Sequence, residues 1–248
     1  SLQLGRLGLP AGVQQGIMSI SMLLVQNLTN MMGTAVVATS IAVMRVDGFA
    51  MLPNFTFGMA LATFVGQNVG AGRMDRVERG SRNGLIPQGK LKSAVLLAVG
   101  VSVTLSLMLI FFGKYLVGWF TDSEQILALG TRAFRILATG YIASAVWQVL
   151  SGIMRGAGDT MPSMWISLAV NVLIRLPVAY LLAFLSRSET WPSGSPDSLY
   201  ISLLVTWCSG ALITFLWYRR GTWKDKSLIR KRPDPELGMP IPDIVELD

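Results

Sequence analysis

Long apolar stretches, separated by short polar turns, restrict this chain to a membrane fold. A membrane-spanning helix needs about 20 consecutive apolar residues, and six stretches reach that length, at about residues 9–33, 35–69, 93–120, 126–154, 161–185 and 198–218. Charged residues make up only 14% of the 248 residues and hydrophobic ones 52%, whereas soluble domains carry about 25% charged residues. The sequence therefore predicts an all-α polytopic membrane protein, a bundle of six transmembrane helices without a soluble catalytic domain.

The composition also excludes most enzyme chemistry. The chain contains no His and a single Cys, Cys208. Without His there is no His-ligated metal site and no Ser-His-Asp or Cys-His catalysis, and one Cys permits neither an internal disulfide nor a Cys-rich metal site. We therefore expect a protein that is not an enzyme and that has no metal or organic cofactor.

Basic residues gather in the connections on one side of the expected bundle. If the chain starts in the cytoplasm, 15 of its 21 Lys and Arg residues fall on cytoplasmic segments, mainly residues 73–92 and 219–232. This bias is the positive-inside signature of multi-pass membrane proteins, so both termini are expected in the cytoplasm. It also accounts for the net charge of +7, because basic segments beside spans contact anionic lipid; nucleic acid is not an expected partner. Residues 1–223 then form a helical lobe and residues 224–248 a cytoplasmic tail.

Polar side chains form stripes on three of the apolar stretches. They recur every three or four residues, which places them on one face of each helix. Such residues either join helices through hydrogen bonds or line a water-filled cavity, and three coincident stripes favour the cavity. A mid-span guanidinium needs a carboxylate, carbonyls or water, which makes Arg175 the strongest candidate. The candidate substrate-cavity residues are Gln15, Ser19, Gln26, Asn30, Asn54, Tyr141, Ser144, Gln148, Asn171 and Arg175.

Arg45 and Asp47 are the candidates for ion coupling. They lie two positions apart, so they cannot face each other on a helix. Either each has its own partner, or they mark a helix break near Gly48. Asp47 is the only carboxylate expected near the middle of the membrane, where it would serve a proton- or cation-linked role or form a salt bridge at the cavity rim.

Several short motifs together resemble those of a known family. The resemblance extends from about Leu7 to Trp223 and is carried by Gly8-Leu9-Pro10, Asp47-Gly48-Phe49-Ala50-Met51-Leu52-Pro53-Asn54, Phe64-Val65-Gly66-Gln67-Asn68-Val69-Gly70-Ala71-Gly72, Arg155-Gly156-Ala157-Gly158-Asp159-Thr160 and Arg175-Leu176-Pro177. In this order they are similar to the multidrug and toxic compound extrusion (MATE) transporters, in the bacterial branch.

The resemblance implies an antiporter of twelve spans in two six-span lobes, located in the bacterial inner (plasma) membrane. Such a protein exports organic cations or amphipaths in exchange for inward Na⁺ or H⁺. The motif order matches the second lobe, so we expect a fragment, or a chain that needs a separately made first lobe. Some members carry acidic cation-site residues where this chain has Gln14, Gln15, Met18 and Ser144. The coupling acid is then either in the missing lobe or Asp47.

Two alternative functions remain at this stage. A lipid-linked oligosaccharide flippase of the same superfamily would need a strongly cationic cavity for a diphosphate, and mid-span basic residues are few here. A non-transporting membrane scaffold would need no polar stripes inside its spans.

Overall fold

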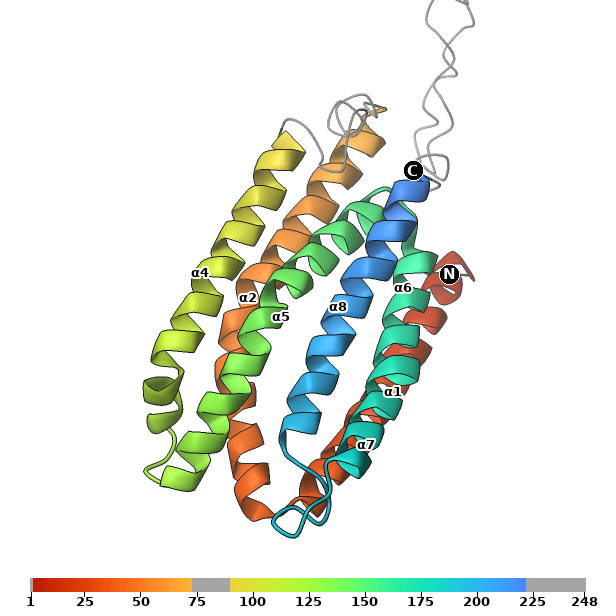
Figure 1. Ribbon diagram of the computed structural model, residues 1–248. Coiled ribbons are helices and arrows are strands. Elements are labelled where there is room, and N and C mark those ends of the chain that lie inside the picture. The colour runs from red at the N-terminus through yellow and green to blue at the C-terminus, as the bar shows by residue number, and fades with distance from the viewer. Residues whose placement is uncertain (1, 73–89, 222–248) are drawn as a thin grey trace, which may run out of the picture.

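The structure is a computed structural model, and it describes residues 2–72 and 90–221. These residues form a bundle of long helices without any β-strand (Figure 1), so the all-α fold class is confirmed for the described chain. The helices are α1 (Leu2–Met31), α2 (Thr34–Gly70), α4 (Lys90–Gly118), α5 (Glu124–Gly156), α6 (Thr160–Leu168), the π-helical segment η1 (Ala169–Ile174), α7 (Arg175–Leu185) and α8 (Asp197–Arg220). The expected tail at residues 224–248 and most of the basic segment at residues 73–92 lie outside the described residues.

The helices run roughly side by side, and α5 lies against α2, α4 and α8. Helices α2, α4 and α5 form one side, while α1 packs beside α6, η1 and α7 on the other. The start of α1 and the end of α8 lie at the same end of the bundle (Figure 1). The side chains of Phe134, Tyr141 and Ile153 on α5 are fully buried, so α5 forms the core against which α2, α4 and α8 pack.

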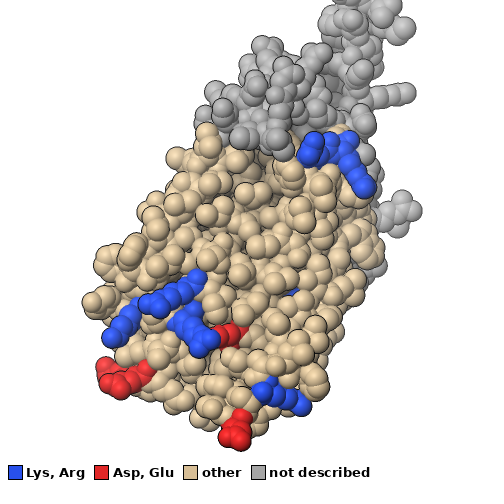
Figure 2. All heavy atoms as spheres, in the orientation of Figure 1, with Lys and Arg blue, Asp and Glu red and all other residues tan. Residues whose placement is uncertain are grey.

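The outer surface suits a bilayer. By length and composition, five helical segments of the described chain could cross a membrane: Thr34–Gly70, Val95–Gly118, Glu124–Gly156, Thr160–Leu185 and Asp197–Arg220. Large apolar side chains such as Phe49, Phe111 and Leu173 are exposed on the outside of the bundle. Figure 2 shows few charged side chains on this face; they gather in its lower half and at its upper right, and the rest of the described surface is uncharged. Helix α1, which is not among these five segments, runs alongside them in the same bundle (Figure 1).

Glycines allow α2 and α5 to approach backbone to backbone. A Cβ atom added at Gly152 would collide with the carbonyl oxygen of Gly58, and one at Gly58 would lie 2.9 Å from the carbonyl oxygen of Gln148. A Cβ at Gly156 would collide with the carbonyl oxygen of Ala62. Small residues spaced four apart permit such close helix packing in membranes. This contact fixes the polar face of α5 relative to α2.

The fifth apolar stretch is not a regular α-helix, which the sequence analysis did not predict. Its middle, η1, is π-helical, and the backbone N–H of Arg175 donates to the carbonyl of Val170, five residues earlier. Pro177 explains the position of this change, because its ring lacks an N–H donor and clashes with the carbonyl four residues before it, within η1.

The π turns keep one row of side chains aligned. In an α-helix with 3.6 residues per turn, each four-residue step drifts by about 40° around the axis. The wider π turn rotates less per residue and offsets this drift. Ser163, Ser167, Asn171 and Arg175, each four residues apart, consequently all face the same interior cavity.

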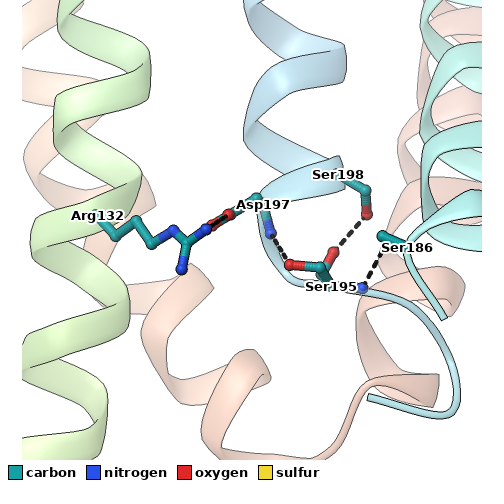
Figure 3. A network of polar contacts seen from close by, with 5 residues as sticks. All are labelled: Arg132, Ser186, Ser195, Asp197 and Ser198. Atoms are coloured by element: carbon teal, nitrogen blue, oxygen red, sulfur yellow. Dashed lines mark hydrogen bonds and ion pairs between the residues drawn. The ribbon is translucent and has the colours of Figure 1, made fainter. Parts of the chain in front are cut away.

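A polar network fixes the start of α8 (Figure 3). Arg132 on α5 forms an ion pair with Asp197, the first residue of α8. The backbone N–H of Ser195 donates to Ser186 Oγ at 2.9 Å, and Ser198 Oγ donates to the carbonyl of Ser195 at 2.7 Å. The loop after α7 is thereby tied to both α5 and α7, which positions the first turns of α8 beside the cavity.

Candidate substrate cavity

A cavity of about 520 Å³ lies inside the bundle. Its walls come from α1, α2, α5, α6, η1, α7 and α8, whereas α4 contributes no lining residue. Pockets for small organic ligands measure about 300–1,000 Å³ and combine apolar walls with a few polar groups. This cavity has both properties, with Met and Trp side chains beside Ser, Asn, Gln and charged groups.

Half of the twelve residues singled out in the sequence meet at this cavity. They come from five different elements, α1, α2, α5, η1 and α7, which the fold brings around one space. Those that line it are Gln26, Asp47, Ser144, Gln148, Asn171 and Arg175.

Most of the polar stripe on α1 does not line the cavity. Gln15, Ser19 and Asn30 are exposed and are not among the lining residues; Ser19 Oγ donates to the carbonyl of Gln15, and Asn30 Oδ1 accepts from Gln26 Nε2 at 3.0 Å. Helix α1 lines the cavity with Met18, Met22, Val25, Gln26 and Thr29, so Gln26 is the one candidate of this stripe that reaches it. Periodicity places side chains on one face of a helix, but it does not tell which face meets a neighbour.

Asp47 lies deep in the bundle and is held by Tyr141. The Tyr141 hydroxyl donates to Asp47 Oδ1 at 2.5 Å, and the Tyr141 ring is fully buried against Trp207, with 5.4 Å between ring centroids. At the helical rise of 1.5 Å per residue, Asp47 lies about 20 Å from the start of α2. Tyr141 does not line the cavity itself, so it acts by orienting Asp47.

Arg175 is the opposite charge that faces Asp47. Both side chains line the cavity, and they interact electrostatically without a salt bridge between them. The guanidinium Nε is buried and has no hydrogen-bond partner among the described residues. Asp47 does not form the expected salt bridge at the cavity rim within the described residues. It accepts the hydrogen bond from Tyr141.

Arg45 faces away from the cavity. It is exposed, and its guanidinium carbon lies 5.8 Å from the centre of the Phe120 ring, a cation–π distance. Helix α2 continues through Gly48 and Pro53, so there is no break at this position. Arg45 and Asp47 therefore have separate partners and do not mark a helix break. Of the two, only Asp47 reaches the cavity.

Asn54 joins three helices instead of lining the cavity. It is fully buried; its Oδ1 accepts from Ser102 Oγ of α4 at 2.7 Å, and its Nδ2 donates to the carbonyl of Tyr141 of α5 at 3.4 Å. Asn54 thus forms hydrogen bonds between helices, which was the alternative to a place in the cavity wall.

Exchanging Asn54 and Ser102 for Ala, singly and together, should reveal a coupled pair. We expect a coupling free energy of unfolding of about 0.5–1.5 kcal/mol, because either single change leaves a buried partner without its hydrogen bond. The measurement is unfolding in mixed micelles. Thr104→Ala, which removes an exposed hydroxyl bonded within α4, is the control and should change little. Additive effects of the two substitutions would contradict the assignment.

Sequence reasoning missed the aromatic part of the wall. Trp147, Trp207, Tyr200 and Phe55 line the cavity, and each was hidden in an apolar stretch. Two glycines in the sequence could have indicated these rings. A Cβ at Gly140 would lie 2.7 Å from the Trp207 ring, and a Cβ at Gly210 would lie 2.6 Å from the Trp147 ring. Gly on one helix opposite Trp on the next therefore marks where α5 and α8 pack around these rings.

A bundle of membrane-spanning helices around a cavity with mid-bundle charges is the architecture of a transporter lobe. The MatE family model matches residues 10–181, more than half of the chain. The chain therefore belongs to the MatE family, and the resemblance described above is confirmed.

Individual relatives agree with this family. The chain is 29% identical over 227 residues to the probable multidrug resistance protein YpnP of Bacillus subtilis, covering 92% of this chain and 47% of that protein. It is 24% identical over 236 residues to the probable multidrug resistance protein NorM of Thermotoga maritima, covering 94% of this chain and 47% of that protein. An outward-facing multidrug resistance MATE family transporter shares the fold, with a TM-score of 0.73, 18% identity, and coverage of 90% of this chain and 47% of that one. The chain thus spans about half the length of these proteins.

Proposed function

We propose that this chain forms one half of an antiporter that exports amphipathic, often cationic, organic compounds in exchange for inward Na⁺ or H⁺. The observation that carries the proposal is Asp47, a carboxylate at the wall of a cavity large enough for a drug-sized molecule. The family membership and the names of the relatives, which refer to multidrug resistance, support the same function.

Asp47 offers a simple means of exchange. Tyr141 occupies one carboxylate oxygen, and no described residue donates to the other. A proton or Na⁺ at Asp47 neutralises the charge that would attract an organic cation, so ion and substrate each weaken the binding of the other. Such mutual weakening is a positive, unfavourable coupling free energy between two ligands, and it is reciprocal.

A second six-helix lobe completes the proposed transporter. The relatives are about twice as long as the matched region, and alternating access requires two bodies that rock around a shared site. We propose that this chain supplies one of them in the bacterial inner membrane. The positive-inside bias supports cytoplasmic termini, and the two described ends lie at the same end of the bundle (Figure 1).

Binding to the purified chain tests this function. The chain is placed in phosphatidylcholine nanodiscs, and tetramethylrhodamine methyl ester, a permanent cation, is measured by equilibrium dialysis against empty nanodiscs. We expect saturable binding that weakens at least about tenfold, which is 1.4 kcal/mol, when Na⁺ replaces choline or when the pH falls.

A cavity variant and a matched control accompany this measurement. Gln148→Ala should weaken binding several-fold because Gln148 lines the cavity. Gln125→Ala, on the exposed first turn of the same helix, should not. Saturable binding that is indifferent to Na⁺ and to pH would refute ion exchange at this lobe, and no saturable binding would refute the cavity as a substrate site.

A further inference from the structure

The charges around the cavity do not match a simple cationic substrate. Among the lining residues, Arg155 and Arg175 are positive and Asp47 alone is negative. A compound with only a positive charge would be attracted to Asp47 but repelled by the two guanidinium groups. The wall therefore has a surplus of positive charge that such a compound leaves unbalanced.

Arg175 is the group whose interactions are incomplete. A guanidinium carries five N–H donors and no acceptor, and no described residue accepts a hydrogen bond from Arg175. Its Nε is buried without a partner, although the side chain lies at the inner wall of a membrane bundle, where an unpaired charge is costly. Asp47 is not within salt-bridge distance and accepts its short hydrogen bond from Tyr141 instead.

A second buried donor without a partner lines the same cavity. Ser151 Oγ, on α5, is inaccessible and makes no hydrogen bond within the described residues. Gln148, one turn earlier on the same face, also has no side-chain hydrogen bond within the described chain. Asn171 faces the cavity one turn before Arg175, but its Nδ2 already donates to the carbonyl of Ser167 at 2.9 Å. The cavity thus contains several hydrogen-bond donors for which the protein supplies no acceptor.

The position of Arg175 is fixed by the fold. The π turns of η1 bring Asn171 and Arg175 onto the cavity side, and the carbonyl of Asn171 accepts a hydrogen bond from Ser21 Oγ of α1 at 3.0 Å. Arg175 is therefore attached to a helix segment that is tied to its neighbour. A planar guanidinium held in this way suits a carboxylate, which it can bind through two parallel hydrogen bonds.

We propose that this cavity binds zwitterionic amphipaths, with a substrate carboxylate at Arg175 and the substrate's cationic group toward Asp47. This inference rests on the proposed transport function and specifies its substrate class. The apolar body of the compound would lie against Trp147 and Trp207, which line the same cavity.

Two dyes that differ in one group test the inference. Tetramethylrhodamine carries a free carboxylate and a delocalised cation, and its methyl ester has the same ring system without the anionic charge. Both are measured by equilibrium dialysis on the full chain in phosphatidylcholine nanodiscs, with empty nanodiscs subtracted. We expect the acid to bind about tenfold more tightly than the ester, because a charge-assisted pair forms at Arg175.

Variants at Arg175 connect the preference to this residue. Arg175→Gln should abolish the preference, bringing the affinity ratio of acid to ester to about one. Arg175→Lys keeps the charge but loses the planar pair of donors, so it should retain an intermediate ratio and shows whether a charged side chain at this position supports folding. Arg135→Gln, an exposed position on α5, should leave the ratio unchanged.

The outcomes separate this inference from the proposed function. If the ester binds as tightly as the acid in the unchanged protein, the carboxylate site is refuted while the drug cavity remains. If the preference persists in Arg175→Gln, another cation is responsible and the assignment to Arg175 is wrong. If neither dye binds saturably, the proposed function itself fails.

Discussion

Replacing Gly152 with Ala is expected to destabilise the bundle, although the same exchange stabilises most helices. In a helix interior, Ala is favoured over Gly by about 1 kcal/mol. At Gly152 the added Cβ would collide with the carbonyl oxygen of Gly58 on α2. A backbone atom cannot swing away as a flexible side chain can, so α2 and α5 must separate.

The cost follows from overpacking of a well-packed contact, which is typically about 1–3 kcal/mol. At about 2–4 °C per kcal/mol for a chain of this size, the melting temperature should fall by roughly 2–12 °C. Intrinsic tryptophan fluorescence during heating in detergent micelles measures this change. Trp147 on α5 lines the cavity, and its fluorescence contributes to the signal of unfolding.

Gly100→Ala provides the matched control. Gly100 lies on α4, where an added Cβ would meet no atom within 4 Å, and the exchange should be neutral or slightly stabilising. Equal melting temperatures for the two variants would show that α2 and α5 are not in backbone contact at Gly152. Since α2 carries Asp47 and α5 carries Ser144 and Gln148, we also expect Gly152→Ala to lower ligand affinity.

Much of the fold could be predicted from the sequence because lipid leaves few alternatives. A long apolar stretch in a bilayer must satisfy its own backbone hydrogen bonds, so it forms a helix. All six apolar stretches coincide with helical segments of the described chain. The π segment was missed because hydropathy does not distinguish α from π turns, although Pro177 marked its place.

The site was predictable where the residue type itself demanded a partner. Asp47 and Arg175 were identified because a charge in a membrane span is costly, and both line the cavity. Gln15 and Ser19, whose polar groups can face either way at low cost, are exposed and do not line the cavity. The sequence could not show that Tyr141 would bond to Asp47, since that contact joins residues 94 positions apart.

Asp47→Asn is expected to remove the ion dependence of ligand binding. Asn has nearly the same size and its Oδ1 can still accept the hydrogen bond from Tyr141, so the local packing should be preserved. The charge that is proposed to attract both an organic cation and the coupling ion is lost. Opposite charges about 4 Å apart interact by about 4 kcal/mol at an effective dielectric constant of 20, and desolvation offsets part of this.

We therefore expect the affinity for tetramethylrhodamine methyl ester to fall at least about tenfold, which corresponds to 1.4 kcal/mol. The remaining binding should no longer respond to Na⁺ or to pH, because no other described carboxylate lines the cavity. Dialysis across a series of Na⁺ concentrations and pH values measures both effects. Asp122→Asn, at an exposed position between α4 and α5, should behave like the unchanged chain.

Tyr141→Phe separates the charge of Asp47 from its orientation. This variant keeps the carboxylate but removes the hydroxyl that donates to it at 2.5 Å. If Asp47 is the exchange site, Tyr141→Phe should retain a response to Na⁺ or pH, shifted in midpoint, whereas Asp47→Asn should have none. An ion response that survives in Asp47→Asn would place the coupling group outside this lobe, and the role of this half of the transporter would then be substrate binding alone.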